Sequence, residues 1–173
     1  MRKKIRNRLN MILAVLLIIV MADSLLPGTV ATAKVQENNK KRLQTFVYKN
    51  GDSVIKSVKI SMKAKGNIRK KSDIRNIMGY DIICSDVVGL VGEPFSINTD
   101  SKFNKAVISF KIDRSKLGNT KLEDLLFLWY YEEEYWFVEM KTKYNKKKST
   151  VSVETTQLGK FMIVDKYEWF GAW

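Results

Sequence analysis

Apolar and polar residues alternate along several short segments of this chain. In residues 54–64 one face carries Val58, Ile60, Met62 and Ala64, and the other carries Lys59, Ser61 and Lys63. Residues 106–112 repeat the pattern, with Ala106, Ile108, Phe110 and Ile112 on the inward face. Residues 150–154 do so on a smaller scale, with Val151 and Val153 inward. A period of two predicts half-buried β-strands in all three segments.

The stretch 125–164 holds three further runs of aromatic and β-branched residues. Residues 125–131 are apolar at almost every position, which predicts a central strand covered on both faces. The pattern then predicts a turn at Glu132-Glu133-Glu134, a returning strand at 135–140, a basic loop at 141–148 and a closing strand at 160–164.

Shorter signals complete the pattern. Residues 45–48 predict a short edge strand, and the Asn50-Gly51 pair after it favours a hairpin turn. Residues 67–76 indicate either one helical turn, capped by Ser72 or Asp73, or a loop. Residues 122–124 fit a brief helical turn within a long loop.

The elements together predict an all-β fold. About seven to eight short strands, with no long amphipathic helix among them, are typical of an antiparallel β-sandwich. We expect an N-terminal signal helix before it. The predicted division is a signal peptide at 1–33, a flexible leader at 34–52, the β-sandwich domain at 53–164 and an aromatic, linker-like tail at 165–173.

The first 33 residues have the three parts of a secretory signal. Five basic residues precede an apolar run at 11–21, and Ala31-Thr32-Ala33 forms an A-x-A site that places cleavage before Lys34. The alternative is an uncleaved anchor, which would be the chain's only contact with a membrane. Asp23 and Pro27 interrupt the apolar run and favour removal. We therefore expect a secreted or cell-surface protein.

The charge is strongly basic. The formal net charge is +13, and removal of the signal takes away five of 31 basic and one of 18 acidic residues, which leaves +9. Such a surface attracts polyanions, although scattered lysines also serve solubility. The densest basic run contains the candidate polyanion contacts Lys141, Lys143, Lys146, Lys147 and Lys148. Tyr144 lies among them, but export argues against a nucleic-acid partner.

The composition argues against catalysis. The chain has no histidine, and so lacks the usual general base and the commonest metal ligand. Gly89 and Gly92 are followed by Glu93-Pro94 and not by the Lys-Ser/Thr of a phosphate loop. Cys84 lies in an apolar run and is expected to be a small buried residue. We predict no enzymatic activity, no cofactor and no metal site.

Four segments carry a resemblance to a known family, namely GLVGEPFSI (89–97), AVISFKID (106–113), WYYEEEYW (129–136) and VSVETTQLGKFMIVDKYEWFGAW (151–173). They resemble an exported β-sandwich module that precedes a von Willebrand factor type A domain in surface proteins of Gram-positive bacteria. The resemblance covers about half of the chain. It implies a chain truncated before that domain, because the nearest string to its Asp-x-Ser-x-Ser site begins at Asp113 and lacks the second serine.

The corner before the last strand departs from the family pattern. Gln157-Leu158-Gly159 stands where a His-Phe-Ser-like corner is typical. Similar-looking sandwiches of adhesion receptors and death-domain scaffolds cut themselves at such a corner. That reaction needs a hydroxyl or thiol nucleophile and a histidine base, so we expect no self-cleavage here.

The aromatic residues of the predicted hairpin have two interpretations. Trp129, Tyr130, Tyr131, Tyr135 and Trp136 could form a carbohydrate platform, but cross-strand stabilisation of the sheet is favoured. The expected function is a non-catalytic structural or interaction module of the cell surface, accessory to a von Willebrand factor type A-like protein. The alternative is a secreted binder of anionic wall or membrane polymers. A cell-wall or surface-protein partner is expected, and no oligomeric state is indicated.

Overall fold

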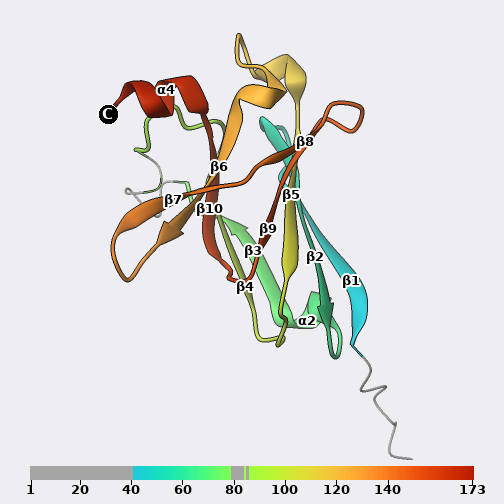
Figure 1. Ribbon diagram of the computed structural model, residues 1–173. Coiled ribbons are helices and arrows are strands. Elements are labelled where there is room, and N and C mark those ends of the chain that lie inside the picture. Colours follow the sequence, from blue (N-terminus) through green and yellow to red (C-terminus); the bar gives the residue numbers. More distant parts are fainter. Residues whose placement is uncertain (1–40, 79–83, 85) are drawn as a thin grey trace, which may run out of the picture. The chain divides into compact units, whose positions relative to one another are not determined.

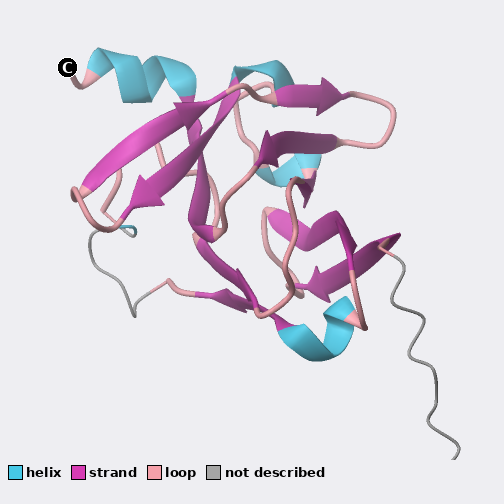
Figure 2. Ribbon diagram, turned by 60° about the horizontal axis from the view of Figure 1, so that its bottom comes forward, coloured by secondary structure: helices cyan, strands magenta, loops and turns pink. Residues whose placement is uncertain are grey.

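A computed structural model of the protein describes residues 41–78, 84 and 86–173 (Figure 1). The predicted signal peptide, its cleavage residues Ala31, Ala33 and Lys34, and the first part of the leader lie outside the described residues. Within the described part, no helix has the length and apolar character needed to cross a membrane. Strands dominate, and the short helices lie at strand ends (Figure 2).

Two five-stranded antiparallel sheets form the domain, which confirms the predicted all-β class. The first sheet has the order β1 (Arg42–Lys49), β2 (Ile55–Ala64), β5 (Ala106–Ile112), β9 (Thr150–Thr155), β8 (Lys143–Asn145). The second has the order β3 (Ser72–Asn76), β4 (Phe95–Thr99), β10 (Gly159–Asp165), β6 (Leu125–Tyr131), β7 (Trp136–Met140). The helical elements are α2 (Ile68–Lys71), η1 (Arg114–Lys116), η2 (Leu122–Asp124) and α4 (Lys166–Gly171).

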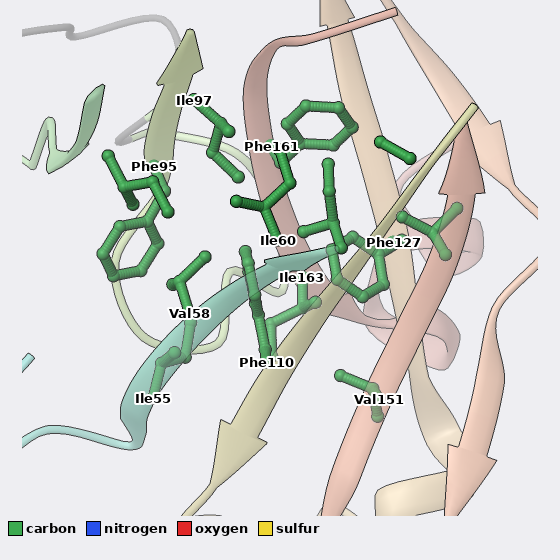
Figure 3. Close-up of a cluster of buried hydrophobic side chains, with 14 of the residues drawn as sticks. Ile55, Val58, Ile60, Phe95, Ile97, Phe110, Phe127, Val151, Phe161 and Ile163 are labelled. Atoms are coloured by element: carbon green, nitrogen blue, oxygen red, sulfur yellow. The ribbon is translucent and has the colours of Figure 1, made fainter. Parts of the chain in front are cut away.

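The main core lies between the two sheets. The predicted inward residues of β2, β5 and β9 are all buried and pack against β4, β6 and β10. Aromatic rings cross this layer in series: the ring centroid of Phe110 is 5.5 Å from that of Phe95 and 4.7 Å from that of Phe127 (Figure 3). Edge-on and tilted ring contacts of this kind add to the burial of apolar surface. The alternation in the sequence therefore fixes both the strands and the side on which they pack.

A second apolar layer covers the outer face of the second sheet. Leu128 and Tyr130 of β6, together with Met162 and Val164 of β10, pack under Trp169 of α4 and under Cys84 and Val87. Strand β6 is thus covered on both faces, as its continuous apolar run predicts, and Cys84 is buried as expected. The outer face of the first sheet has no such cover in the described part of the chain.

Gly89 allows this second layer to close. Its φ is +72°, and a Cβ atom at this position would lie 2.8 Å from Cβ of Glu168 in α4. The carbonyl of Gly89 accepts a hydrogen bond of 2.7 Å from the amide of Asp165. The next residue, Leu90, forms an isolated bridge with Val164. Glycine is needed because two backbones meet here in a conformation that other residues rarely adopt.

Two boundaries differ from the predictions near the amino-terminal side. The leader predicted to reach residue 52 ends earlier, because β1 extends over Arg42–Lys49 and not only over 45–48. The side-chain amide of Gln44 anchors this extension through bonds to the carbonyls of Ala64 and Gly66. In 67–76, Asn67 is the N-cap of α2, and Ser72 and Asp73 begin strand β3, so neither is the N-cap; Ser72 stands at the C-cap position. Pairing with β4 overrides the weak local preference of this polar segment.

Two further boundaries differ near the carboxyl-terminal side. The basic loop at 141–148 contains β8, which pairs with β9 as an edge strand. The tail at 165–173 forms α4, whose Trp169 is buried and is not part of a linker. The carboxylate of Asp165 starts this helix by accepting bonds from the amides of Tyr167 and Glu168, and it also accepts a bond of 2.8 Å from the Thr120 hydroxyl.

Asp113 predicts a pH-dependent contribution to stability. It follows β5, and its carboxylate lies 2.8 Å from the Lys56 ammonium on β2 and accepts a bond from the Ser115 hydroxyl. The bonds to Lys56 and Ser115 lower the pKa of Asp113 from 3.8 to about 2. A carboxylate with a lowered folded-state pKa stabilises the fold above its unfolded pKa, and this contribution is lost as the pH falls through the folded value.

We therefore expect Asp113→Asn to melt at a lower temperature than the wild type at pH 7, with a difference that vanishes between pH 3.8 and about 2. Thermal unfolding followed by circular dichroism across this range measures it. Asp73→Asn is the control, because the Asp73 side chain is 63% exposed and its ion pair with Arg75 is long, at 3.9 Å. An Asp113→Asn difference that stays constant with pH would contradict the assignment.

Candidate polyanion-binding face

The outer face of the first sheet carries lysines on four of its five strands. Strand pairing places them on the side opposite the core residues, and we call this group the lysine face: Lys49 on β1, Lys59 and Lys63 on β2, Lys111 on β5 and Lys143 on β8. Four of them are exposed and Lys111 is half-buried. The same alternation that directs Val58 and Ile60 into the core directs these side chains to solvent.

The register sets the lysines in rows that run across the strands. One row reads Val47, Lys59, Ser109, Ser152, Lys143, and the next reads Lys49, Ser57, Lys111, Thr150, Asn145. Neighbouring strands are about 4.8 Å apart. Within each row, lysines are therefore separated by roughly 10–15 Å and do not crowd one another.

Small hydroxyl side chains fill the spaces between the lysines. They are Thr45, Ser57, Ser61, Ser109, Thr150 and Ser152. The hydroxyls of Thr45 and Ser61 lie 3.0 Å apart and form one of the cross-strand bonds on this face. These short side chains leave space around the ammonium groups. They also supply hydrogen-bond donors to an anionic ligand. The face also carries three exposed apolar residues, namely Leu43, Val47 and Val107.

Glu154 is the single acidic residue in the five strands of the first sheet. It forms an ion pair of 2.7 Å with Lys105, and this hydrogen bond lowers the pKa of its carboxyl group. Its charge is thus already matched by a cation next to the face. Lys111 is held in place because its ammonium donates to the carbonyl of Lys148. The resulting field over the sheet is strongly positive.

The structure separates the five candidate lysines predicted from the sequence. Lys143 belongs to the lysine face, whereas Lys147 and Lys148 lie in the turn between β8 and β9, and Lys141 precedes β8. Lys146 pairs at 2.9 Å with Glu123, and this bond lowers the pKa of the glutamate. The basic run in the sequence therefore predicts only one residue of the lysine face, which is Lys143. Lys49, Lys59, Lys63 and Lys111 are scattered along the chain, and alternation alone marks them.

The described residues contain no group of three or more cysteine, aspartate or glutamate side chains placed to hold a metal ion. Glu132, Glu133 and Glu134 form the turn between β6 and β7, as predicted. Glu132 pairs with Lys160 at 2.6 Å, and Glu133 accepts a bond of 2.7 Å from the Tyr131 hydroxyl. These carboxylates have structural partners.

Comparisons with family models, with curated proteins and with solved structures find no match to this chain.

Proposed function

We propose that this chain is a non-catalytic, exported β-sandwich module that binds anionic polymers through the lysine face. The observation that carries the proposal is the charge pattern of the first sheet. Five lysines stand on its open face, and the single acidic residue of its strands is paired with Lys105. A flat array of spaced cations favours an extended, repeating polyanion over a small anion.

The cell-surface setting rests on the secretory signal at 1–33. In that setting the ligands are anionic wall polymers or anionic membrane headgroups. Each lysine near an anionic surface contributes on the order of 1 kcal/mol at physiological ionic strength. A multivalent face of this kind therefore supports useful affinity without a deep pocket.

Removing charge from the face should weaken binding much more than removing the same charge elsewhere. We expect the triple variant Lys59→Gln, Lys63→Gln, Lys143→Gln to bind polyphosphate about a hundredfold more weakly than the wild type, because three contacts are lost. The matched control is Lys141→Gln, Lys147→Gln, Lys148→Gln, which removes an equal charge from the predicted basic loop. Binding is measured by calorimetry or by retention on isolated cell walls.

The salt dependence provides a second readout. Wild-type binding should fall steeply as salt rises, and the face variant should show a shallower slope because fewer charges are engaged. Equal losses in the two triple variants would mean that net charge alone causes retention. Retention that survives high salt would contradict the electrostatic mechanism.

The resemblance supports a second proposal, in which the module acts beside a von Willebrand factor type A-like protein. Three aromatic side chains at the end of the described chain offer a contact surface for such a neighbour: Tyr167 is 67%, Phe170 55% and Trp173 88% exposed. A coding sequence that continues into an Asp-x-Ser-x-Ser segment would support this proposal, and direct binding to an isolated type A domain would test it.

A further inference from the structure

A hollow with an aromatic floor lies beside the corner that joins β9 to β10. It has a volume of about 720 Å³, and its lining includes Asn98, Asp100, Trp129, Tyr131, Glu133 and Gln157. A second hollow of about 460 Å³ shares Trp129, Thr156 and Gln157 with it and adds Met140 on β7. The two therefore meet at Trp129. Volumes in this range suit small-molecule or oligosaccharide ligands.

The indole of Trp129 lies over an empty side-chain position on β10. Trp129 pairs with Phe161, so Gly159, two residues earlier, faces the same side of the sheet. A Cβ atom on Gly159 would lie only 3.1 Å from Nε1 of Trp129. The glycine thus lets the ring approach the strand closely. This is a specific consequence of the Gln157-Leu158-Gly159 corner.

The Trp129 indole combines a flat apolar ring with one N–H donor. Its Nε1 is buried and has no hydrogen-bond partner among the described residues. Such a buried donor without an acceptor is rare in folded proteins, so packing and not a hydrogen bond within the described chain sets the position of this indole. The ring also lies beside that of Tyr131, with centroids 5.4 Å apart and planes inclined by 31°. Together the two rings form an extended aromatic surface.

The groups around this surface are hydrogen-bonding and, on balance, acidic. Asp100, Glu132 and Glu133 line the larger hollow, as do the side-chain amides of Asn98 and Gln157. Glu132 is also paired with Lys160 and Glu133 accepts a bond from Tyr131, each through one carboxylate oxygen. The Thr155 side chain bonds to the backbone of the corner: the Gln157 amide donates to the Thr155 hydroxyl, which donates to the carbonyl of Gln157. These bonds close the turn locally, and Gln157 is exposed.

These features define the class of ligand. Carboxylates repel the polyanions that suit the lysine face, whereas carboxylate and amide oxygens accept bonds from hydroxyl groups. An indole face attracts the C–H groups on the flat side of a pyranose ring. A basic peptide would also match the carboxylates, and its cations can lie over an indole face, so it is the alternative occupant that the test below separates from a sugar.

We infer that this hollow is a binding site for a short, uncharged oligosaccharide, with Trp129 as the stacking platform. The site is separate from the lysine face in both position and ligand chemistry. A module with both sites would bind two components of one surface, a polyanion and a neutral glycan chain. Simultaneous engagement would raise the overall affinity without new contacts.

The test uses the full chain and two tetrasaccharides, the β-1,4-linked oligomers of N-acetylglucosamine and of glucose. We expect one or both to bind with a dissociation constant of about 1 mM or lower by calorimetry. Binding should shift the indole N–H resonance of Trp129 in the NMR spectrum. Because the contacts are largely uncharged, the affinity should be unchanged in high salt.

Variants locate the site. Gln157→Ala, at an exposed position, should bind about tenfold more weakly through loss of its hydrogen bonds. Tyr131→Ala should also weaken binding, and Gly159→Ala should do so by displacing the indole. Trp173→Ala is the matched control. This tryptophan is 88% exposed and lies beside Trp169 in the outer layer of the second sheet, away from the hollow, so its replacement should leave the affinity unchanged.

Three results would overturn the inference. They are no binding of either sugar up to about 10 mM, sugar binding that Gln157→Ala and Tyr131→Ala leave intact, and binding of tetralysine at the site in the absence of any sugar binding. Polyphosphate binding is measured alongside, on the wild type and on the triple variant of the lysine face. Failure of the sugar site therefore leaves the polyanion proposal independently testable.

Discussion

Replacement of Phe110 by alanine should lower the free energy of unfolding by about 3–5 kcal/mol. Phe110 has no exposed surface, and its ring contacts Phe95 of β4 and Phe127 of β6 in the opposite sheet. Truncation removes both contacts and leaves a cavity between the two sheets. The paired strands cannot move together freely to fill it. Because small domains are stable by only about 5–15 kcal/mol, this single change is expected to consume a large part of the stability.

Urea unfolding followed by circular dichroism measures the effect. The control is Val107→Ala on the same strand, because Val107 faces outward and is 36% exposed. It should change stability by roughly 0.5 kcal/mol or less. A similar loss in both variants would mean that strand propensity, and not the core between the sheets, governs stability at β5.

Replacement of Trp169 by alanine should also cost about 3–5 kcal/mol. Trp169 is only 7% exposed, packs edge-on to Phe137 with centroids 5.8 Å apart, and donates a bond of 2.9 Å from Nε1 to Glu139. Its removal uncovers Tyr130 and Met162 on the outer face of the second sheet. We therefore expect increased binding of a hydrophobic dye as well as lower stability.

Trp173→Ala is the control for this prediction, since its exposed ring should contribute within about 0.5 kcal/mol. A chain that ends at Asp165 gives the sharper comparison. It should be at least as unstable as Trp169→Ala, because the whole of α4 is lost. If the truncated chain unfolds at the wild-type urea concentration, the segment is a linker after all, as its sequence predicts.

The parts of the fold that the sequence predicts well are those where one face is apolar and the other is polar. Val58, Ile60 and Met62 mark β2, and Ala106 to Ile112 mark β5, because alternation encodes both strand and side. The sequence fails where long-range pairing decides the structure. Ser72–Asn76 is mostly polar and has little strand signal of its own, yet it pairs with β4 as strand β3.

The candidate sites show the same division. A run of lysines is visible in the sequence, but the face that gathers Lys49, Lys59, Lys111 and Lys143 exists only once the register is known. The hollow at Trp129 depends on the approach of β10 to β6 and on an absent side chain at Gly159. Of the hairpin aromatics, Tyr130 packs across the strands against Phe137, and Trp129 and Tyr131 line the hollow. Tyr135 lies in the turn and is exposed.

The placement of β1 has a mechanical consequence. The described chain enters at Arg42, at the opposite end of the domain from α4, and β1 runs from that entry toward the far end (Figure 1). Arg42 pairs with Ala64 and Lys49 with Ser57, so β1 is bonded to β2 along its whole length. A pull on Arg42 directed away from α4 acts along the strand. Its hydrogen bonds to β2 are then loaded in shear, all at once, and not peeled open one after another.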